Sequence, residues 1–118
     1  LVQGVFPDSP FADSAQKQLS ELEEWFAAKD FETAMHYVRR RAYDSALLYL
    51  RAVVTDYPNT DKARQAMLEM VRVFRLPALN YREDAEEVCA ALRAGFPNDP
   101  QVRQACAAPV DSAATAGR

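Results

Sequence analysis

Apolar residues recur along this chain at intervals of three and four positions, the spacing that places side chains on one face of an α-helix. The clearest stripe consists of Ala63, Ala66, Met67, Met70, Val71 and Phe74. Similar stripes predict further helices over 10–28, 31–40, 44–56, 81–95 and 100–107. No segment alternates apolar and polar residues as a strand does, so the pattern predicts an all-α fold.

A turn motif of the form aromatic–Pro–(Asp/Asn)–x–(Pro/Asp) occurs at residues 6–10, 57–61 and 96–100. Its proline ends a helix, because proline lacks an N–H donor and clashes with the preceding turn. The side chain of Ser9, Thr60 or Asp99 can then accept the first hydrogen bonds of the next helix. Each copy therefore predicts one helix end followed at once by a helix start.

The prolines of the second and third copies are about 39 residues apart, which suits one helical hairpin of the tetratricopeptide kind. Those of the first and second copies are about 51 residues apart, which predicts a hairpin plus an extra helix. We therefore expect stacked antiparallel helix pairs in a tetratricopeptide-like solenoid over residues 1–107. The small, polar residues 108–118 are expected to form a disordered tail. The opening residues 1–5 read as the end of a helix, so we expect the C-terminal part of a longer protein.

Composition argues against several classes of function. The chain has 118 residues, 26% of them charged, and a net charge of −3, which gives no electrostatic reason to expect a nucleic-acid partner. Its three glycines argue against a glycine-rich phosphate loop. No apolar run approaches the ~20 residues that cross a bilayer as a helix.

The sequence offers little chemistry for catalysis. His36 is the only histidine, and nothing in the sequence places a nucleophile, carboxylate or metal ligand beside it. The acids near Glu24 belong to a solvated helix face, whereas catalytic carboxylate pairs need a cleft that shifts one pKa. Met67 and Met70 are expected in the core rather than in a binding groove. We therefore expect no enzyme activity, no cofactor and no metal.

Basic residues gather in one part of the chain. Between Thr33 and Arg51 the sequence has four arginines and a single acid, Asp44. The run Arg39-Arg40-Arg41 suits a helix C-terminus, where the helix dipole favours cations. It also suits a surface that docks a partner's carboxylates, because arginine makes forked contacts with them. The two interpretations are compatible.

The stretches 6–15, 34–46 and 53–60 resemble the BamD (ComL) family of outer-membrane-protein assembly lipoproteins, over about residues 1–105. The resemblance implies a non-catalytic scaffold on the periplasmic face of the outer membrane, held there by a lipidated cysteine upstream of this segment. It also implies a protein partner, the periplasmic POTRA domain of the BamA barrel. The family usually has glycine where Arg41 stands, so this turn takes another conformation or a left-handed arginine. A family arginine that faces BamA falls at Tyr49, with Arg40 and Arg51 near enough to replace it.

The residues expected to bind the partner are therefore Arg39, Arg40, Arg41, Tyr49 and Arg51. The alternative is another periplasmic repeat adaptor, resembling the CpoB cell-division coordinator, or an accessory subunit of a membrane complex. A lipobox and two more repeats upstream would favour the assembly scaffold, and an N-terminal coiled coil would favour the alternative. An enzyme that uses His36 is the third hypothesis.

Cys89 and Cys106 stand at nearly equal distances on either side of Pro97. In an antiparallel hairpin, such residues lie at the same height, within the Cα separation that a disulfide needs. An oxidising periplasm would favour the bond. Two buried free thiols are the alternative.

Overall fold

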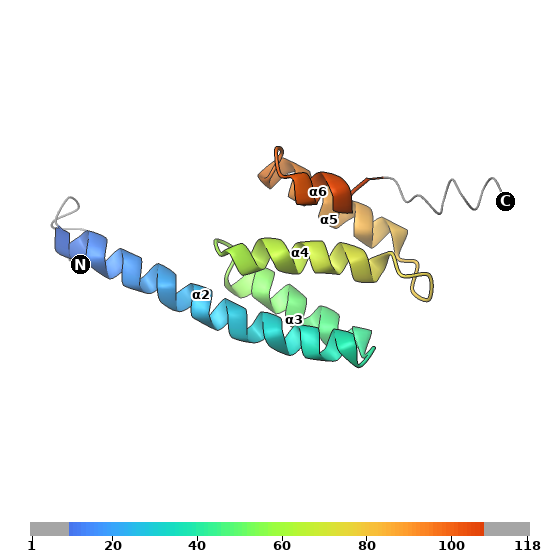
Figure 1. Ribbon diagram of the computed structural model, residues 1–118, viewed down its shortest axis with the longest axis horizontal. Coiled ribbons are helices and arrows are strands. Elements are labelled where there is room, and N and C mark those ends of the chain that lie inside the picture. Colours follow the sequence, from blue (N-terminus) through green and yellow to red (C-terminus); the bar gives the residue numbers. More distant parts are fainter. Residues whose placement is uncertain (1–9, 108–118) are drawn as a thin grey trace. The chain divides into compact units, whose positions relative to one another are not determined.

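The computed structural model describes residues 10–107, and within this range the chain is built from helices without a strand. In order they are α2 (Pro10–Arg39), α3 (Tyr43–Asp56), α4 (Asp61–Phe74), α5 (Arg82–Gly95) and α6 (Pro100–Ala105) (Figure 1). The predicted all-α class is thus confirmed over the described range. The first turn motif with Ser9, and the tail 108–118, lie outside the described residues.

Helix α2 is continuous over 30 residues, which corrects the expectation of separate helices over 10–28 and 31–40. Lys29 and Asp30, which connect the two predicted helices, are neither glycine nor proline, so nothing there breaks a helix. The Thr33 hydroxyl donates to the Lys29 carbonyl oxygen at 3.1 Å within the continuous helix. What changes near residue 27 is the face that carries apolar residues, not the backbone. The long first interval is therefore occupied by a lengthened helix rather than by an extra one.

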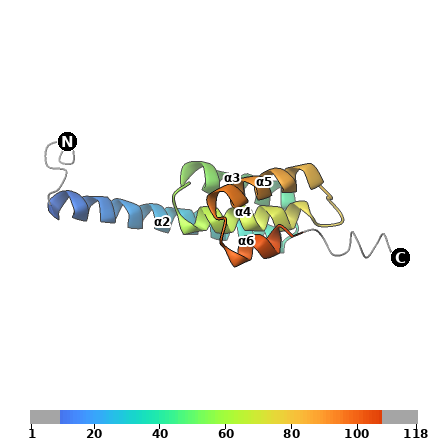
Figure 2. The same ribbon diagram turned by 90° about the horizontal axis from the view of Figure 1, so that it is seen from above.

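The chain forms two compact units, residues 1–66 and 67–118, with the boundary inside α4. In the first unit, α2 and α3 pack as an antiparallel hairpin (Figures 1 and 2). Its buried apolar residues are Ala27, Ala34 and Val38 from α2, and Ala46, Leu47, Leu50 and Val53 from α3. The alanines allow the two helix backbones to approach closely, and the larger side chains fill the space beside them.

The turn from α2 to α3 is a Schellman motif. The Ala42 N–H donates to the Tyr37 carbonyl oxygen and the Arg41 N–H to that of Val38, both at 2.9 Å. Such a turn requires a left-handed residue at the position after the helix cap, which is usually glycine. Here Arg41 takes that conformation with φ 62°. Of the two expectations for this turn, the structure therefore shows the left-handed arginine.

Two of the predicted helix caps are confirmed. The Ala63 N–H donates to Thr60 Oγ1 at 3.2 Å at the start of α4. The Gln101 N–H donates to Asp99 Oδ1 at 2.9 Å at the start of α6, where Pro100 is among the first helical residues. Both side chains satisfy N–H groups that a helix start leaves without a partner.

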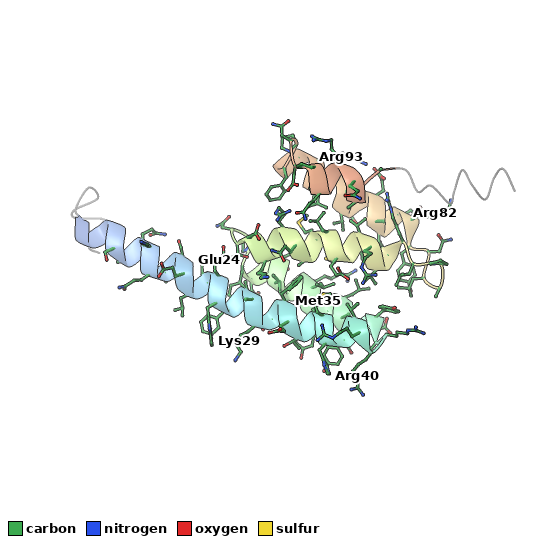
Figure 3. All side chains as sticks on the ribbon, viewed as in Figure 1. Glu24, Lys29, Met35, Arg40, Arg82 and Arg93 are labelled. Carbon is green, nitrogen blue, oxygen red and sulfur yellow. A yellow bond between two sulfur atoms is a disulfide. The ribbon has the colours of Figure 1, made fainter. Side chains whose placement is uncertain are left out.

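Contacts from α2 fix the start of α4 within the first unit. The Asp61 N–H donates to Glu24 Oε2 at 3.1 Å, so a carboxylate of α2 supplements the Thr60 cap (Figure 3). The Lys62 ammonium lies 5.0 Å from the centre of the Phe31 ring. Hydrogen bonds from Gln65 and Arg64 hold the pKa of the Asp61 carboxyl below its usual value. The contacts with Glu24 and Phe31 thus join the start of α4 to α2.

One apolar cluster of the second unit joins α4, α5 and α6. Its members are Val71 of α4, Cys89 and Leu92 of α5, and Val102 and Cys106 at α6. Met67 packs against this cluster but remains partly exposed, whereas Met70 is buried. The expectation that Met67 lies in the core is thus only partly correct, because it stands at the edge of the buried face.

Helix α6 is short, and a disulfide bond and two arginines hold it in place. Cys89 and Cys106 form a disulfide with their Cα atoms 5.7 Å apart. Arg75 Nη1 donates to the carbonyl oxygens of Ala105 and Ala107 at 2.7 and 2.8 Å, and Arg93 Nη2 donates to that of Cys106 at 3.1 Å. The two guanidinium groups therefore satisfy carbonyls that the end of α6 leaves open.

Val71→Asp is expected to abolish cooperative melting of the second unit. Its side chain is 1% exposed, and an unpaired carboxylate there costs several kcal/mol, of the order of a small domain's whole stability. Met67→Asp should destabilise less, because that position can reach water, and Leu48→Asp should be nearly neutral, since Leu48 is 68% exposed. Thermal melts followed by circular dichroism rank the three variants. Equal melting temperatures for Val71→Asp and Leu48→Asp would contradict the core assignment.

Thiol titration of the denatured, non-reduced protein is expected to find no free thiol when the protein is isolated from an oxidising compartment. Replacing both cysteines by alanine should lower stability by ~3 kcal/mol, because the bond closes a loop of 17 residues. The reduced parent protein is the matched control. Two free thiols in protein isolated from the periplasm would exclude the bridge there.

Candidate partner-binding site

The three consecutive arginines lie where α2 ends and the chain turns toward α3. Arg39 is the last residue of α2, and Arg40 and Arg41 form the turn. All three side chains are exposed, and Figure 3 shows Arg40 projecting away from the ribbon. The helix C-terminus favours cations here, and the exposed guanidinium groups also remain accessible to an anionic partner. The structure is therefore compatible with both roles considered for this run.

Tyr49, the position of the family's arginine, has a different environment from the arginines. Its ring stacks on that of Tyr37 of α2, with centroids 5.5 Å apart and planes 12° from parallel. The His36 ring meets the Tyr37 ring edge-on, with centroids 5.5 Å apart. Tyr49 is half-buried as a result. It therefore helps to fix α3 against α2 and offers a partner only part of its surface.

Arg51 lies on the exposed side of α3, one turn beyond Leu48. Along the helix it is about 12 Å from Tyr43, where α3 begins, so the structure separates it from the arginines of the turn. Both groups nevertheless belong to the same hairpin of the first unit. They form two arms of one basic surface rather than a single cluster.

Leu48 is a surface residue that the sequence argument did not select. Leu48 is 68% exposed, which is the highest value for a large apolar residue in the described part of the chain. The signal was present in the sequence, because Leu48 is apolar but falls outside the buried stripe of Ala46, Leu47 and Leu50. Leu48 thus adds apolar contact area one turn from Arg51, and arginine is a residue type that is enriched at protein interfaces.

The basic surface therefore comprises Arg39, Arg40, Arg41, Leu48, Tyr49 and Arg51. Asp44, in the first turn of α3, is the only acid between Thr33 and Arg51. Exposed charges of this kind act mainly on the rate of association, and salt screens them. The surface has the chemistry to attract a partner rich in carboxylates.

Other kinds of site find little support among residues 10–107. His36 is exposed and contacts Tyr37 rather than a nucleophile. The described residues contain no group of three or more His, Cys, Asp or Glu side chains placed to hold a metal ion. None of the helices described is both long enough and apolar enough to span a membrane.

Comparison with known proteins agrees with the resemblance seen in the sequence. A family model described as YfiO, outer membrane lipoprotein, matches residues 1–92. The outer membrane protein assembly factor BamD of Vibrio cholerae serotype O1 is 34% identical over 62 residues, which are 52% of this chain and 26% of that protein. No solved structure matches the chain significantly. Because the family model covers more than half of its length, the chain belongs to the YfiO family of outer membrane lipoproteins.

Proposed function

We propose that this segment is a non-catalytic scaffold of the machinery that assembles β-barrel proteins in the outer membrane. In this role, the basic surface of the α2–α3 hairpin docks a protein partner on the periplasmic side. Family membership and the relative's name as an assembly factor support the proposal. The segment matches about a quarter of that relative, so the role belongs to a longer protein. An upstream lipid anchor would hold that protein at the membrane.

The left-handed backbone conformation of Arg41 is the structural observation that best supports the proposal. A left-handed conformation costs a residue with a Cβ about 1–2 kcal/mol, which glycine avoids. Among the described residues, no hydrogen bond or ion pair of the Arg41 side chain offsets this cost, and the side chain is exposed. Residues held in such conformations concentrate where function uses them. An arginine in a glycine position, beside two more arginines, is explained if a partner binds its guanidinium group.

The partner that we propose is the periplasmic POTRA domain of the BamA barrel, which the family resemblance implies. Arg40, Arg41 and Arg51 replace the single family arginine whose position Tyr49 occupies. Arginine makes bidentate contacts with carboxylates, so an acidic patch on the POTRA domain fits this surface. Leu48 supplies apolar contact area between the two arms.

Arg41→Gly separates stability from binding. The variant is expected to be more stable by ~0.5–1 kcal/mol, because glycine relieves the left-handed strain. It should nevertheless bind the POTRA domain more weakly, because one guanidinium group is lost. Thermal melting and titration calorimetry measure the two effects on the same sample. A variant that is stabilised and binds as the parent does would show that Arg41 is only part of the turn.

Arg40→Glu/Arg51→Glu is expected to lower the affinity for the purified POTRA domain at least tenfold at low salt. Reversed charges repel an acidic partner, and salt should reduce the difference from the parent. Arg82→Glu/Arg103→Glu, on exposed positions of α5 and α6, changes the net charge equally and serves as the control. Equal binding by both double variants would show that the basic surface takes no part in binding. Capture of a different envelope protein as the main partner of the parent would contradict the choice of the POTRA domain.

A further inference from the structure

Helix α6 has few apolar contacts of its own to hold it against the rest of the second unit. It is six residues long, and a helix this short is unstable in water unless it packs on another element. Val102 is the buried residue of α6, and its side chain is 1% exposed. The neighbouring Gln101, Arg103 and Gln104 are exposed. The packing of one valine is therefore a weak attachment for the whole helix.

Hydrogen bonds from two arginines also reach the end of α6, but water competes with them. Arg75 Nη1 donates to the carbonyl oxygens of Ala105 and Ala107. Arg93 Nη2 donates to that of Cys106 (Figure 3). The Arg75 side chain is half-buried and that of Arg93 is exposed, so either guanidinium group can bind water instead. Such an exchange of partners costs little free energy, and these contacts orient the end of α6 more than they hold it.

The disulfide is the remaining attachment, and it is covalent. Cys89 lies inside α5, Cys106 directly follows α6, and the bond between them closes a loop of 17 residues. While the bond is intact, α6 cannot move away from α5, so undocking would gain it little conformational freedom. Once the bond is broken, that freedom opposes the weak attachments alone. The position of α6 therefore depends on the oxidation state of the two cysteines.

The surface beneath α6 is apolar. Val71 of α4 and Leu92 of α5 belong to the same cluster as Val102 and Cys106, and they are 1% and 0% exposed. If α6 leaves, both side chains lose part of their cover, and contiguous apolar surface of this kind binds other chains. Val71 and Leu92 still connect α4 to α5 in that state. Release of α6 is thus a local change that uncovers a surface without requiring the unit to unfold.

We propose that the Cys89–Cys106 bond is a redox lock on α6. The disulfide form holds α6 over the apolar cluster, and the dithiol form releases it while α4 and α5 remain folded. The stability that the bond supplies is then lost at α6 first. The lock lies in the second unit and the basic surface in the first, so either proposal can fail without the other.

Opening the lock is a thiol–disulfide exchange with a dithiol, either a dithiol protein or a small reagent. Cys106 is the sulfur that is attacked, because it follows a short helix and is 6% exposed, whereas Cys89 is 0% exposed within α5. The attacking thiolate forms a mixed disulfide with Cys106, and the Cys89 sulfur leaves as a thiolate and takes up a proton. The second thiol of the reagent then displaces Cys106. Two electrons and two protons thus pass from the dithiol to the bridge, and the reagent becomes a disulfide.

Hydrogen exchange measured by mass spectrometry on the full-length natural protein tests the lock. Peptides covering residues 100–107 are compared between the oxidised protein and protein kept in dithiothreitol. Their exchange is expected to be at least tenfold faster in dithiothreitol, because bonds such as that from the Cys106 N–H to the Val102 carbonyl oxygen open when α6 undocks. Peptides from α4 should stay protected in both states. Peptides from α3, in the first unit, serve as the internal reference.

Two results of this comparison would overturn the proposal. Equal exchange of residues 100–107 in both states would mean that the valine and the arginines suffice to hold α6. Loss of protection in α4 and α5 to the same extent as in α6 would mean that the bond supports the whole unit and that α6 is not released on its own.

Two double variants separate the bond from the other attachments. Cys89→Ala/Cys106→Ala should exchange like the reduced parent, with or without dithiothreitol, because it has no bond to break. Arg75→Gln/Arg93→Gln keeps the bond and is the matched control, so its α6 should stay protected when oxidised. A cysteine variant with a protected α6 contradicts the lock. An arginine variant that releases α6 as fully as reduction does contradicts it as well.

The order of exchange can be read from a trapped intermediate. The oxidised protein is exposed briefly to reduced glutathione, a monothiol, and the thiol that is released is blocked with N-ethylmaleimide. Peptide masses are expected to place glutathione on Cys106 and the maleimide on Cys89, because the less buried sulfur is attacked first. The reverse labelling would overturn the assignment of Cys106 as the attacked sulfur.

Discussion

The close packing of α2 against α3 is the interaction on which the first unit depends. Fully buried alanines, Ala34 on one helix and Ala46 on the other, keep the two backbones near each other, and Leu50 and Val53 close the space beside them. This packing determines which residues of α2 and α3 remain outside. The basic surface at one end of the hairpin and the exposed apolar side chains of α2 beyond α3, such as Leu19 and Leu22, are both consequences of it. A larger side chain at either alanine would separate the helices and displace both surfaces.

The two units reach their stability by different means. The first buries residues along a long hairpin and adds polar contacts, such as that between Glu24 and Asp61, at the start of α4. The second buries Phe74 and Val73 in addition to its apolar cluster, but its last helix is only six residues long. A disulfide and contacts from two arginines hold the end of that helix, as covalent links do in other small units. The proposed binding surface and this covalent support thus lie in different parts of the chain.

Helix α2 carries acids along its length and arginines at its C-terminal end. Glu21, Glu23 and Glu32 lie well inside the helix, whereas Arg39 lies in its last turn with Arg40 just beyond. The helix dipole acts mainly within the terminal turns, so it favours these arginines and has little effect on the acids. The arginines of the basic surface are therefore compatible with the stability of the helix that presents them.

The helical class, the turns and their caps could be predicted from the sequence, because they depend on local chemistry. Proline ends one helix, and the side chains of Thr60 and Asp99 accept the first hydrogen bonds of the next. The sequence also placed Cys89 and Cys106 at matching heights, since spacing about a turn sets height in a hairpin. Which apolar face of a helix has a neighbour, by contrast, depends on tertiary packing. The stripe of Leu19 and Leu22 has the same period as a core stripe, and periodicity is blind to the length of the helix opposite. Likewise, a left-handed Arg41 follows from the packing of the hairpin, because that packing fixes where α2 must end and reverse.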